Sequence, residues 1–351
     1  MFGIVSTIST IEKVIKDNPQ WRKIIEDVDS LFLLRDKDIE SPILALLSQA
    51  GKISFDESIS NFPSRNTIEK FCGCAFIFSN LSKEEADLIQ MRYGIICQST
   101  SSLDASIITQ IDPDHFELLN NEGYYGWRRI CEGLTKPRIP SNCLIINDRN
   151  IFANDYPTQD RTPGLDNLEN LLDVLLPQSY ADGVNNDDTI PFQVLINCDW
   201  GTLHRPPMDL KESYNTFANR INKIKRKLGR QYPITIEFIA LKRDNDFFSE
   251  THNRRIYSNY YTISCDHKVA AFKGGHSRCS QSIDVLKLFS KLEKEKSDQP
   301  VKGHNSFMNN MTESVKRWMD ISKINSYAFS QNGDTRPVIH KISNRLIKPR
   351  D

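Results

Sequence analysis

Apolar residues recur at helical spacing near the start of the chain. Ile11, Val14 and Ile15 begin a pattern that predicts one helix over residues 10–35, and a second helix is predicted over residues 41–50. The first part of the chain is therefore expected to be largely helical.

A shorter apolar run over residues 71–78 predicts a buried strand. It is followed by Ser82 with Glu85 three residues later, the arrangement of a capping box that begins a helix. That helix is expected to continue to about Tyr93, and residues 94–97 are expected to form the next strand. This order indicates a β-α-β element.

Two prolines, Pro137 and Pro140, interrupt the pattern and stop any helix. Before them, the sequence Asp-Pro-Asp at residues 112–114 predicts the start of a helix, and residues 124–134 predict another. We therefore place a stiff linker at residues 136–140.

The remaining pattern alternates between strand and helix. Strands are predicted over residues 143–146, 150–153, 192–196, 234–241, 254–264 and 269–272, with helices from residue 163 and over residues 209–228, 282–296 and 312–324. This order predicts a mixed α+β fold with a mixed sheet. The expected domains are a smaller, mostly helical and acidic α/β domain at residues 1–135, a second α/β domain at 141–330 and a basic tail at 331–351.

The charges are divided unevenly along the chain. Lysine plus arginine and aspartate plus glutamate each number 45, so the formal net charge is zero. From Trp200 to Asp351, however, there are 28 basic and 15 acidic residues, and the remainder of the chain has the opposite imbalance. The balanced total excludes a uniformly basic nucleic-acid coat and an acidic disordered protein. The surplus of the second part favours contact with nucleic acid there.

The eight cysteines point to a reducing compartment, because several lie in apolar runs and none forms a Cys-x-x-Cys pair. No apolar run approaches the roughly 18 residues of a membrane helix. We expect a cytoplasmic protein that has no membrane contact, no cofactor and no metal. The metal candidates set aside on this basis are Cys72 with Cys74, Asp187 with Asp188 and Asp244 with Asp246.

The densest group of reactive side chains surrounds His252. Successive side chains of a strand point to opposite faces, so His252 and Arg254 would share one face. Arginine can hold a phosphate with two parallel hydrogen bonds, and histidine can act as a nucleophile or general acid. Asn259 could donate a further hydrogen bond to a phosphate oxygen. The alternative is an edge strand with solvated arginines.

This strand resembles the signature strand of phospholipase D-like domains. The resemblance is closest to the degenerate form at the C-terminus of MIT-domain proteins and to related modules of bacterial genomic islands. The residues that match are His252, Arg254, Ile256, Ser258 and Asn259, within a similar order of elements over residues 142–274. The resemblance implies a phospholipase D-like mixed sheet flanked by helices, with a catalytic role for His252, Arg254 and Asn259 if the site is active.

Two departures from that family favour binding over cleavage. Asn253 replaces the usual aspartate, and Arg254 stands where the catalytic His-x-Lys motif has lysine. The spacing recurs once, at His276 and Arg278. Asp148 could face His252 across the sheet, although a hairpin turn formed by the residues around Asp148 is the favoured alternative.

Basic and aromatic residues of the second part form the expected nucleic-acid contact, because cations neutralise phosphates and aromatic rings stack on bases. They are Lys223, Lys225, Arg226, Lys227, Arg230, Lys242, Arg243, Arg254, Arg255, Tyr257, Tyr260, His276 and Arg278. A solvated basic helix face is the alternative for the first five.

Three functions remain open at this point. The first is a nucleic-acid-associated binding or scaffolding subunit of a protein complex, which the resemblance places in bacterial antiviral defence or a mobile element. The second is a metal-independent phosphodiesterase or nuclease that uses His252, with a homodimer supplying the second histidine. The third is an adaptor that binds only protein.

Overall fold

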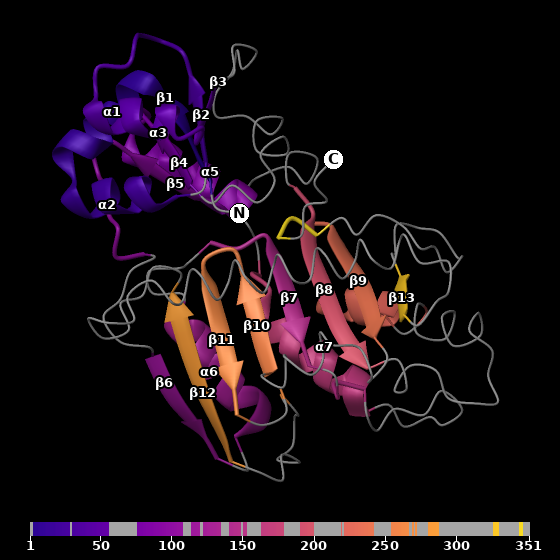
Figure 1. Ribbon diagram of the computed structural model, residues 1–351. Coiled ribbons are helices and arrows are strands. Elements are labelled where there is room, and N and C mark those ends of the chain that lie inside the picture. The colour runs from indigo at the N-terminus through magenta and orange to yellow at the C-terminus, as the bar shows by residue number, and fades with distance from the viewer. Residues whose placement is uncertain are drawn as a thin grey trace.

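The computed structural model of this 351-residue chain describes residues 3–28, 30–55, 76–107, 114–119, 122–134, 140–148, 150–152, 163–178, 190–199, 219, 221–241, 254–266, 269, 271, 280–287, 326–329 and 344–346. These residues form two sheets, of five and eight strands, with helices packed against both (Figure 1). The mixed α+β class predicted from the sequence is confirmed.

The first sheet is wholly parallel, in the order β3-β2-β1-β4-β5. Its elements are β1 (Gly3–Thr7), α1 (Ile8–Asp17), α2 (Pro19–Asp27), β2 (Ser30–Leu34), α3 (Pro42–Gln49), β3 (Ile53–Phe55), β4 (Phe76–Ser79), α5 (Lys83–Tyr93) and β5 (Ile96–Ser99). A parallel sheet is covered on both faces. Accordingly, Ile4 and Val5, which point to opposite faces of β1, are both buried, in two separate apolar clusters.

The single helix predicted over residues 10–35 is wrong. Asn18 ends α1 and its side chain accepts hydrogen bonds from the backbone N–H groups that begin α2, where Pro19 occupies the first helical position. A strand then starts at Ser30. The capping box at Ser82 is confirmed, and Gly94 ends that helix with a φ of 62°.

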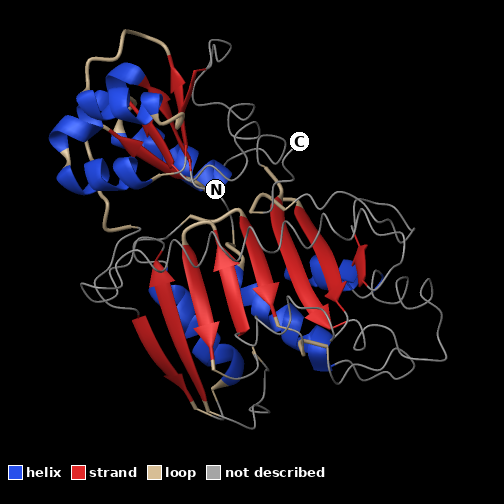
Figure 2. Ribbon diagram, viewed as in Figure 1, coloured by secondary structure: helices blue, strands red, loops and turns tan. Residues whose placement is uncertain are grey.

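The second sheet is mixed, in the order β13-β9-β8-β7-β10-β11-β12-β6. Its strands are β6 (Asp114–Leu118), β7 (Cys143–Asn147), β8 (Phe192–Asp199), β9 (Ile234–Leu241), β10 (Arg254–Ser258), β11 (Tyr261–Cys265), β12 (Gln281–Lys287) and β13 (Ser326–Phe329). β7, β8 and β9 are parallel, and the other pairs are antiparallel. Helices α6 (Gly123–Leu134) and α7 (Pro163–Leu175) lie on one face (Figure 2).

Three predicted elements of this part are wrong. The helix expected to start at residues 112–114 is replaced from Asp114 onward by strand β6, and the helix expected over 282–296 begins as strand β12. Both strands alternate apolar with polar residues, and pairing with each other outweighs the weaker helical pattern. Residues 150–152 form a turn rather than a strand, so the described residues form no hairpin after β7. The helix predicted over 312–324, and residues 209–218 and 220 of the helix predicted over 209–228, lie outside the described residues.

The domain boundary also differs from the one expected at residues 136–140. Strand β6 and helix α6 precede that linker, yet β6 pairs with β12 in the second sheet. The change from one sheet to the other therefore falls between Ser99 and Asp114. At the other end of the chain, Asn344 and Arg345 are 1% and 7% exposed, so this part of the expected flexible tail is packed into the protein.

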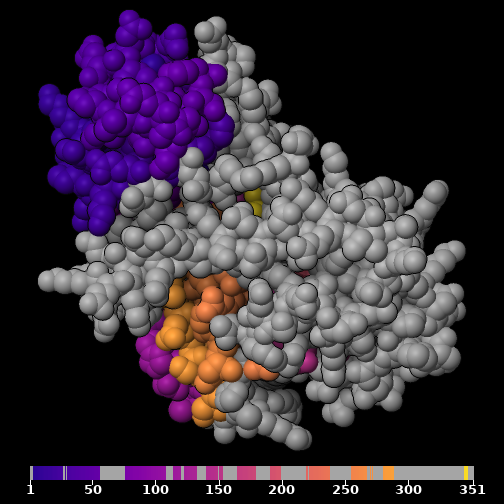
Figure 3. Space-filling model, viewed as in Figure 1, coloured from indigo at the N-terminus to yellow at the C-terminus, as the bar shows by residue number. Residues whose placement is uncertain are grey.

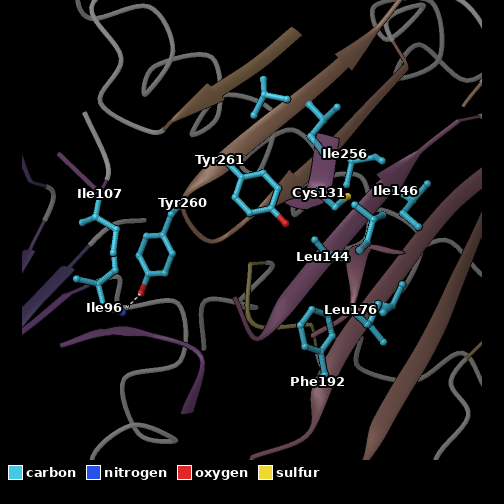
Figure 4. Close-up of a cluster of buried hydrophobic side chains, with 14 of the residues drawn as sticks. Ile96, Ile107, Cys131, Leu144, Ile146, Leu176, Phe192, Ile256, Tyr260 and Tyr261 are labelled. Atoms are coloured by element: carbon cyan, nitrogen blue, oxygen red, sulfur yellow. Dashed lines mark hydrogen bonds between the residues drawn. The ribbon is translucent and has the colours of Figure 1, made fainter. Parts of the chain in front are cut away.

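The two sheets share one apolar cluster, and buried polar contacts cross between them (Figure 4). The Tyr260 hydroxyl oxygen, in the turn between β10 and β11, accepts a hydrogen bond of 2.8 Å from the backbone N–H of Ile96. The Asn142 side chain donates to the backbone oxygen of Tyr93 over 2.9 Å. We use the term inter-sheet joint for Tyr93, Ile96, Asn142, Asn259 and Tyr260.

Candidate anion site at the end of strand β7

The order of the second sheet reverses beside β7. The chain moves from β7 to β8 and β9 on one side, and then returns to place β10 on the other side. In open sheets of this kind, ligands bind at such reversal points, outside the carboxyl ends of the parallel strands. Because β10 is antiparallel to β7, its first residues lie at that end, where Arg255 is paired with Asn147.

An arginine and a buried aspartate are in contact at this end of β7. The Asp148 carboxylate lies 3.8 Å from the Nε of Arg254; the aspartate side chain is 0% exposed and the arginine side chain is 26% exposed. Asp148 also accepts hydrogen bonds from the backbone N–H groups of Asn150 and Val269, over 2.9 and 3.2 Å. A buried charge of this kind is tolerated because it is paired and hydrogen-bonded. Asp148 therefore contacts β10 at Arg254 and does not connect two strands of a hairpin, because β7 is paired with β10 on one side and β8 on the other.

At the same end of β7, the opposite face of the sheet carries a second group of polar side chains: Asn147, Asn197 and Arg255. Ile256 belongs to the apolar cluster under the helices, so the alternation along β10 places Arg254 on the helix side and Arg255 on the other. On that other side, Asn197 donates to the Asn147 side chain over 2.6 Å. The Asn197 Oδ1 and the Arg255 Nε are both buried and have no hydrogen-bond partner.

Asn259 lies in the inter-sheet joint and not in an open site. It is 4% exposed, and its side-chain oxygen accepts hydrogen bonds from the backbone N–H groups of Asn142 and Cys143, over 3.1 and 3.3 Å. Its side-chain nitrogen donates to the Asn142 side chain over 3.0 Å. The phosphate contact expected of Asn259 is wrong, because its amide is used to hold the start of β7 against the β10–β11 turn.

The two tyrosines expected to stack on bases are also buried. Tyr257 is 2% exposed and Tyr260 is 0% exposed. Burial raises the pKa of the Tyr257 hydroxyl above its usual value. Neither ring presents a face on which a base could stack, and Tyr260 belongs to the inter-sheet joint.

The basic residues near the end of the helix at residues 221–228 have different roles. Lys227 contacts Glu169 over 2.8 Å, and the 4%-exposed side chain of Arg230 contacts Asp173 over 3.1 Å, so both attach this helix to α7. Lys225 is partly buried, and desolvation lowers its pKa, whereas Lys223 and Arg226 are exposed.

Other candidate residues fall outside the described part of the chain. They are His252, Lys242, Arg243, His276, Arg278, Cys72, Cys74, Asp187, Asp188, Asp244 and Asp246.

His115, which no sequence motif indicates, lies on the edge strand β6. His115 Nδ1 is 2.7 Å from Asp284, and its Nε2 is 3.0 Å from Glu117. Hydrogen bonds to Asp284 and then Glu117 raise the pKa of the imidazole. The only available indication in the sequence was alternation along residues 114–118, because Asp284 is 169 residues away.

In the described part of the chain, the face of β10, β11, β12 and β6 opposite α6 and α7 therefore carries charges of both signs. Orange atoms of β10–β12 are in view on this side of the molecule (Figure 3). Its charged residues include Arg255 and His115 together with Asp284 and Glu117. This composition does not fit a uniformly basic face.

Among the described residues, no group of three or more His, Cys, Asp or Glu side chains could hold a metal ion. No described helix is long and apolar enough to cross a membrane. No protein-family model matches the sequence, and no curated protein matches it either.

Proposed function

We propose that Arg254 binds a phosphate group of nucleic acid, and that the chain is a nucleic-acid-associated binding subunit of a larger assembly. The observation that carries this proposal is the pair of Arg254 and buried Asp148 at the reversal point of the second sheet. Asp148 forms an ion pair with the Nε of Arg254 and so favours one direction of the side chain. The two terminal nitrogens of the guanidinium are then the fork for two phosphate oxygens.

Two further features support an extended nucleic-acid contact. The part of the chain from Trp200 onward has 28 basic and 15 acidic residues, and Lys223 and Arg226 are exposed on the helix side of the same sheet. Exposed cations of this kind attract a polyanion without reading its sequence. The buried Tyr257 and Tyr260 contribute no base stacking to the proposed interface.

The resemblance to degenerate phospholipase D-like modules supports binding in preference to cleavage. Arg254 occupies the position of the catalytic lysine, and arginine does not replace lysine neutrally. On the same resemblance, we propose a cytoplasmic role in antiviral defence or in a mobile element, within a protein complex.

The test is fluorescence polarisation with labelled single-stranded and double-stranded DNA and RNA at about 50 and about 200 mM salt. Removal of one phosphate contact by Arg254→Gln should reduce the slope of log affinity against log salt by about 0.7–0.9. Arg22→Gln is the matched control, because Arg22 is an exposed arginine paired with Glu26 on α2. Equal slopes in the two variants, or no salt-dependent binding by the unaltered protein, would refute the proposal.

Cleavage remains a second candidate, supported by the buried Asp148 carboxylate beside the signature strand. A labelled oligonucleotide incubated in EDTA tests it. Cleavage by the unaltered protein that His252→Ala abolishes would establish a metal-independent nuclease, and absence of cleavage would exclude this activity. A protein that binds no nucleic acid but co-purifies with another protein after nuclease treatment would instead be an adaptor.

A further inference from the structure

The hairpin of β10 and β11 connects the Arg254 site to the first sheet. β10 has only five residues, from Arg254 to Ser258, and it lies between β7 and β11 with paired neighbours on both sides. Its backbone pairing with both neighbours makes β10 a continuous link between the turn of the hairpin and the end that holds Arg254.

The turn end of the hairpin is attached to the first sheet by buried polar contacts. Tyr260 accepts a hydrogen bond from Ile96 and its ring lies 5.7 Å from that of Phe76. Asn259 bonds to Asn142, which in turn donates to the Tyr93 backbone oxygen. The three hydrogen bonds are buried, so loss of one leaves an unsatisfied polar group away from water.

The other end of the hairpin forms the candidate site. Arg255 pairs with Asn147, the last residue of β7. The residue that follows Asn147 is Asp148, which contacts Arg254. The Asp148 carboxylate also accepts the N–H of Val269 over 3.2 Å. The amide of Val269 therefore reports whether Asp148 keeps its position.

We infer that docking of the first sheet sets the geometry of the Arg254 site through the β10–β11 hairpin. Tyr260 and Asn142 are then positioning residues, which act on the site without touching its ligand. This regulation rests on the proposed phosphate binding at Arg254. The transmission through the hairpin can be tested without any ligand.

The experiment measures amide hydrogen exchange of Val269 in the full chain and in Tyr260→Phe. The variant removes the acceptor for the Ile96 N–H and keeps the ring. We expect Val269 to exchange at least about fivefold faster, the lower end of typical coupling between sites. Tyr125→Phe is the matched control, because this tyrosine is 69% exposed. The Arg22 amide, bonded to Asn18 within the first sheet's helices, is the internal control and should not change.

The outcomes separate the inference from the proposed function. Unchanged Val269 exchange, within about twofold, together with faster exchange at Ile96 would overturn the inference, whatever the protein binds. Asn142→Ala provides a second perturbation of the same joint and should act in the same direction. Oligonucleotide binding is measured separately: if the unaltered protein does not bind, the proposed function fails, while the exchange at Val269 still decides the transmission.

If the protein binds, Tyr260→Phe should weaken the affinity by about fivefold or more, while Tyr125→Phe leaves it unchanged. Because coupling is reciprocal, a saturating oligonucleotide should also slow exchange at Ile96. Binding that is equal in the Tyr260 and Tyr125 variants would refute the inference and leave phosphate binding intact.

Discussion

Replacement of Gly94 by alanine tests the contact between the two sheets most directly. Gly94 ends α5 with a φ of 62°, a conformation that side chains disfavour. A Cβ added there would lie 2.3 Å from the backbone oxygen of Ser141 and 2.7 Å from its carbonyl carbon. Real Cβ contacts are never this short, and Ser141 backbone cannot rotate away as a flexible side chain could.

Gly51 provides a matched control for the magnitude. It has a φ of 70°, and nothing lies within 4 Å of the added Cβ. Gly51→Ala should therefore cost only the backbone term, about 1–2 kcal/mol. Gly94→Ala should cost that amount plus the overpacking of two backbones, about 1–3 kcal/mol more.

The free energy of unfolding is measured in urea by tryptophan fluorescence and far-ultraviolet circular dichroism. Trp21 is buried under the first sheet and Trp127 lies on α6 beside the second, so fluorescence follows both parts. We expect coincident transitions in the unaltered protein, because one apolar cluster spans both sheets. Equal losses for the two glycine variants, within about 0.5 kcal/mol, would refute the close approach of α5 to Ser141.

Three further predictions follow from buried or paired groups. The hydrogen bond to Asp284 is the main cause of the raised pKa of His115, so protonated His115 adds to the free energy of unfolding below about pH 6.5, and this contribution is lost as pH rises through the pKa of the folded state. His115→Gln should flatten the pH dependence of the unfolding free energy in this range. A chain truncated before residue 344 should lose about 2–4 kcal/mol of unfolding free energy in urea, because the hydrogen bonds of the buried Arg345 disappear. Burial raises the pKa of Cys97 and Cys131 to about 12, so mass-mapped iodoacetamide labelling at pH 8 should leave both unmodified until the protein is denatured, and rapid labelling of the native protein would contradict their burial.

The sequence pattern predicted elements whose causes are local. The capping box at Ser82 and the helix that begins at residue 163 depend on residues within a few positions of one another, and both are present. Strands β6 and β12 were not recognised, because their pairing joins residues such as Phe116 and Ile283 that are far apart in sequence. Short apolar segments of this length fit helix and strand alike until a partner strand is known.

Only part of the candidate site was predicted, because the contacts that complete it join residues far apart in the sequence. The motif drew attention to Arg254 and offered Asp148 as a carboxylate across the sheet, although the hairpin turn was favoured for Asp148; the structure pairs the two residues at the end of β7. Residue types alone could not show that Asn259 and Tyr260 face inward, because an asparagine or tyrosine serves equally in a binding site or in a buried hydrogen bond. Only the meeting of β10 with the first sheet assigns them to the joint.

The buried Arg345 has a consequence for the order in which this protein completes its folding during synthesis. Its guanidinium donates to the backbone oxygens of Pro191 and Asn142, and the second of these lies 203 residues earlier. At about 5–20 residues per second, roughly 10–40 s separate the synthesis of the two residues. During that interval the first sheet can form, but the backbone oxygens of Asn142 and Pro191, beside the amino ends of β7 and β8, lack their hydrogen bonds from Arg345. A nascent chain stalled within this interval would expose this edge of the sheet to chaperones.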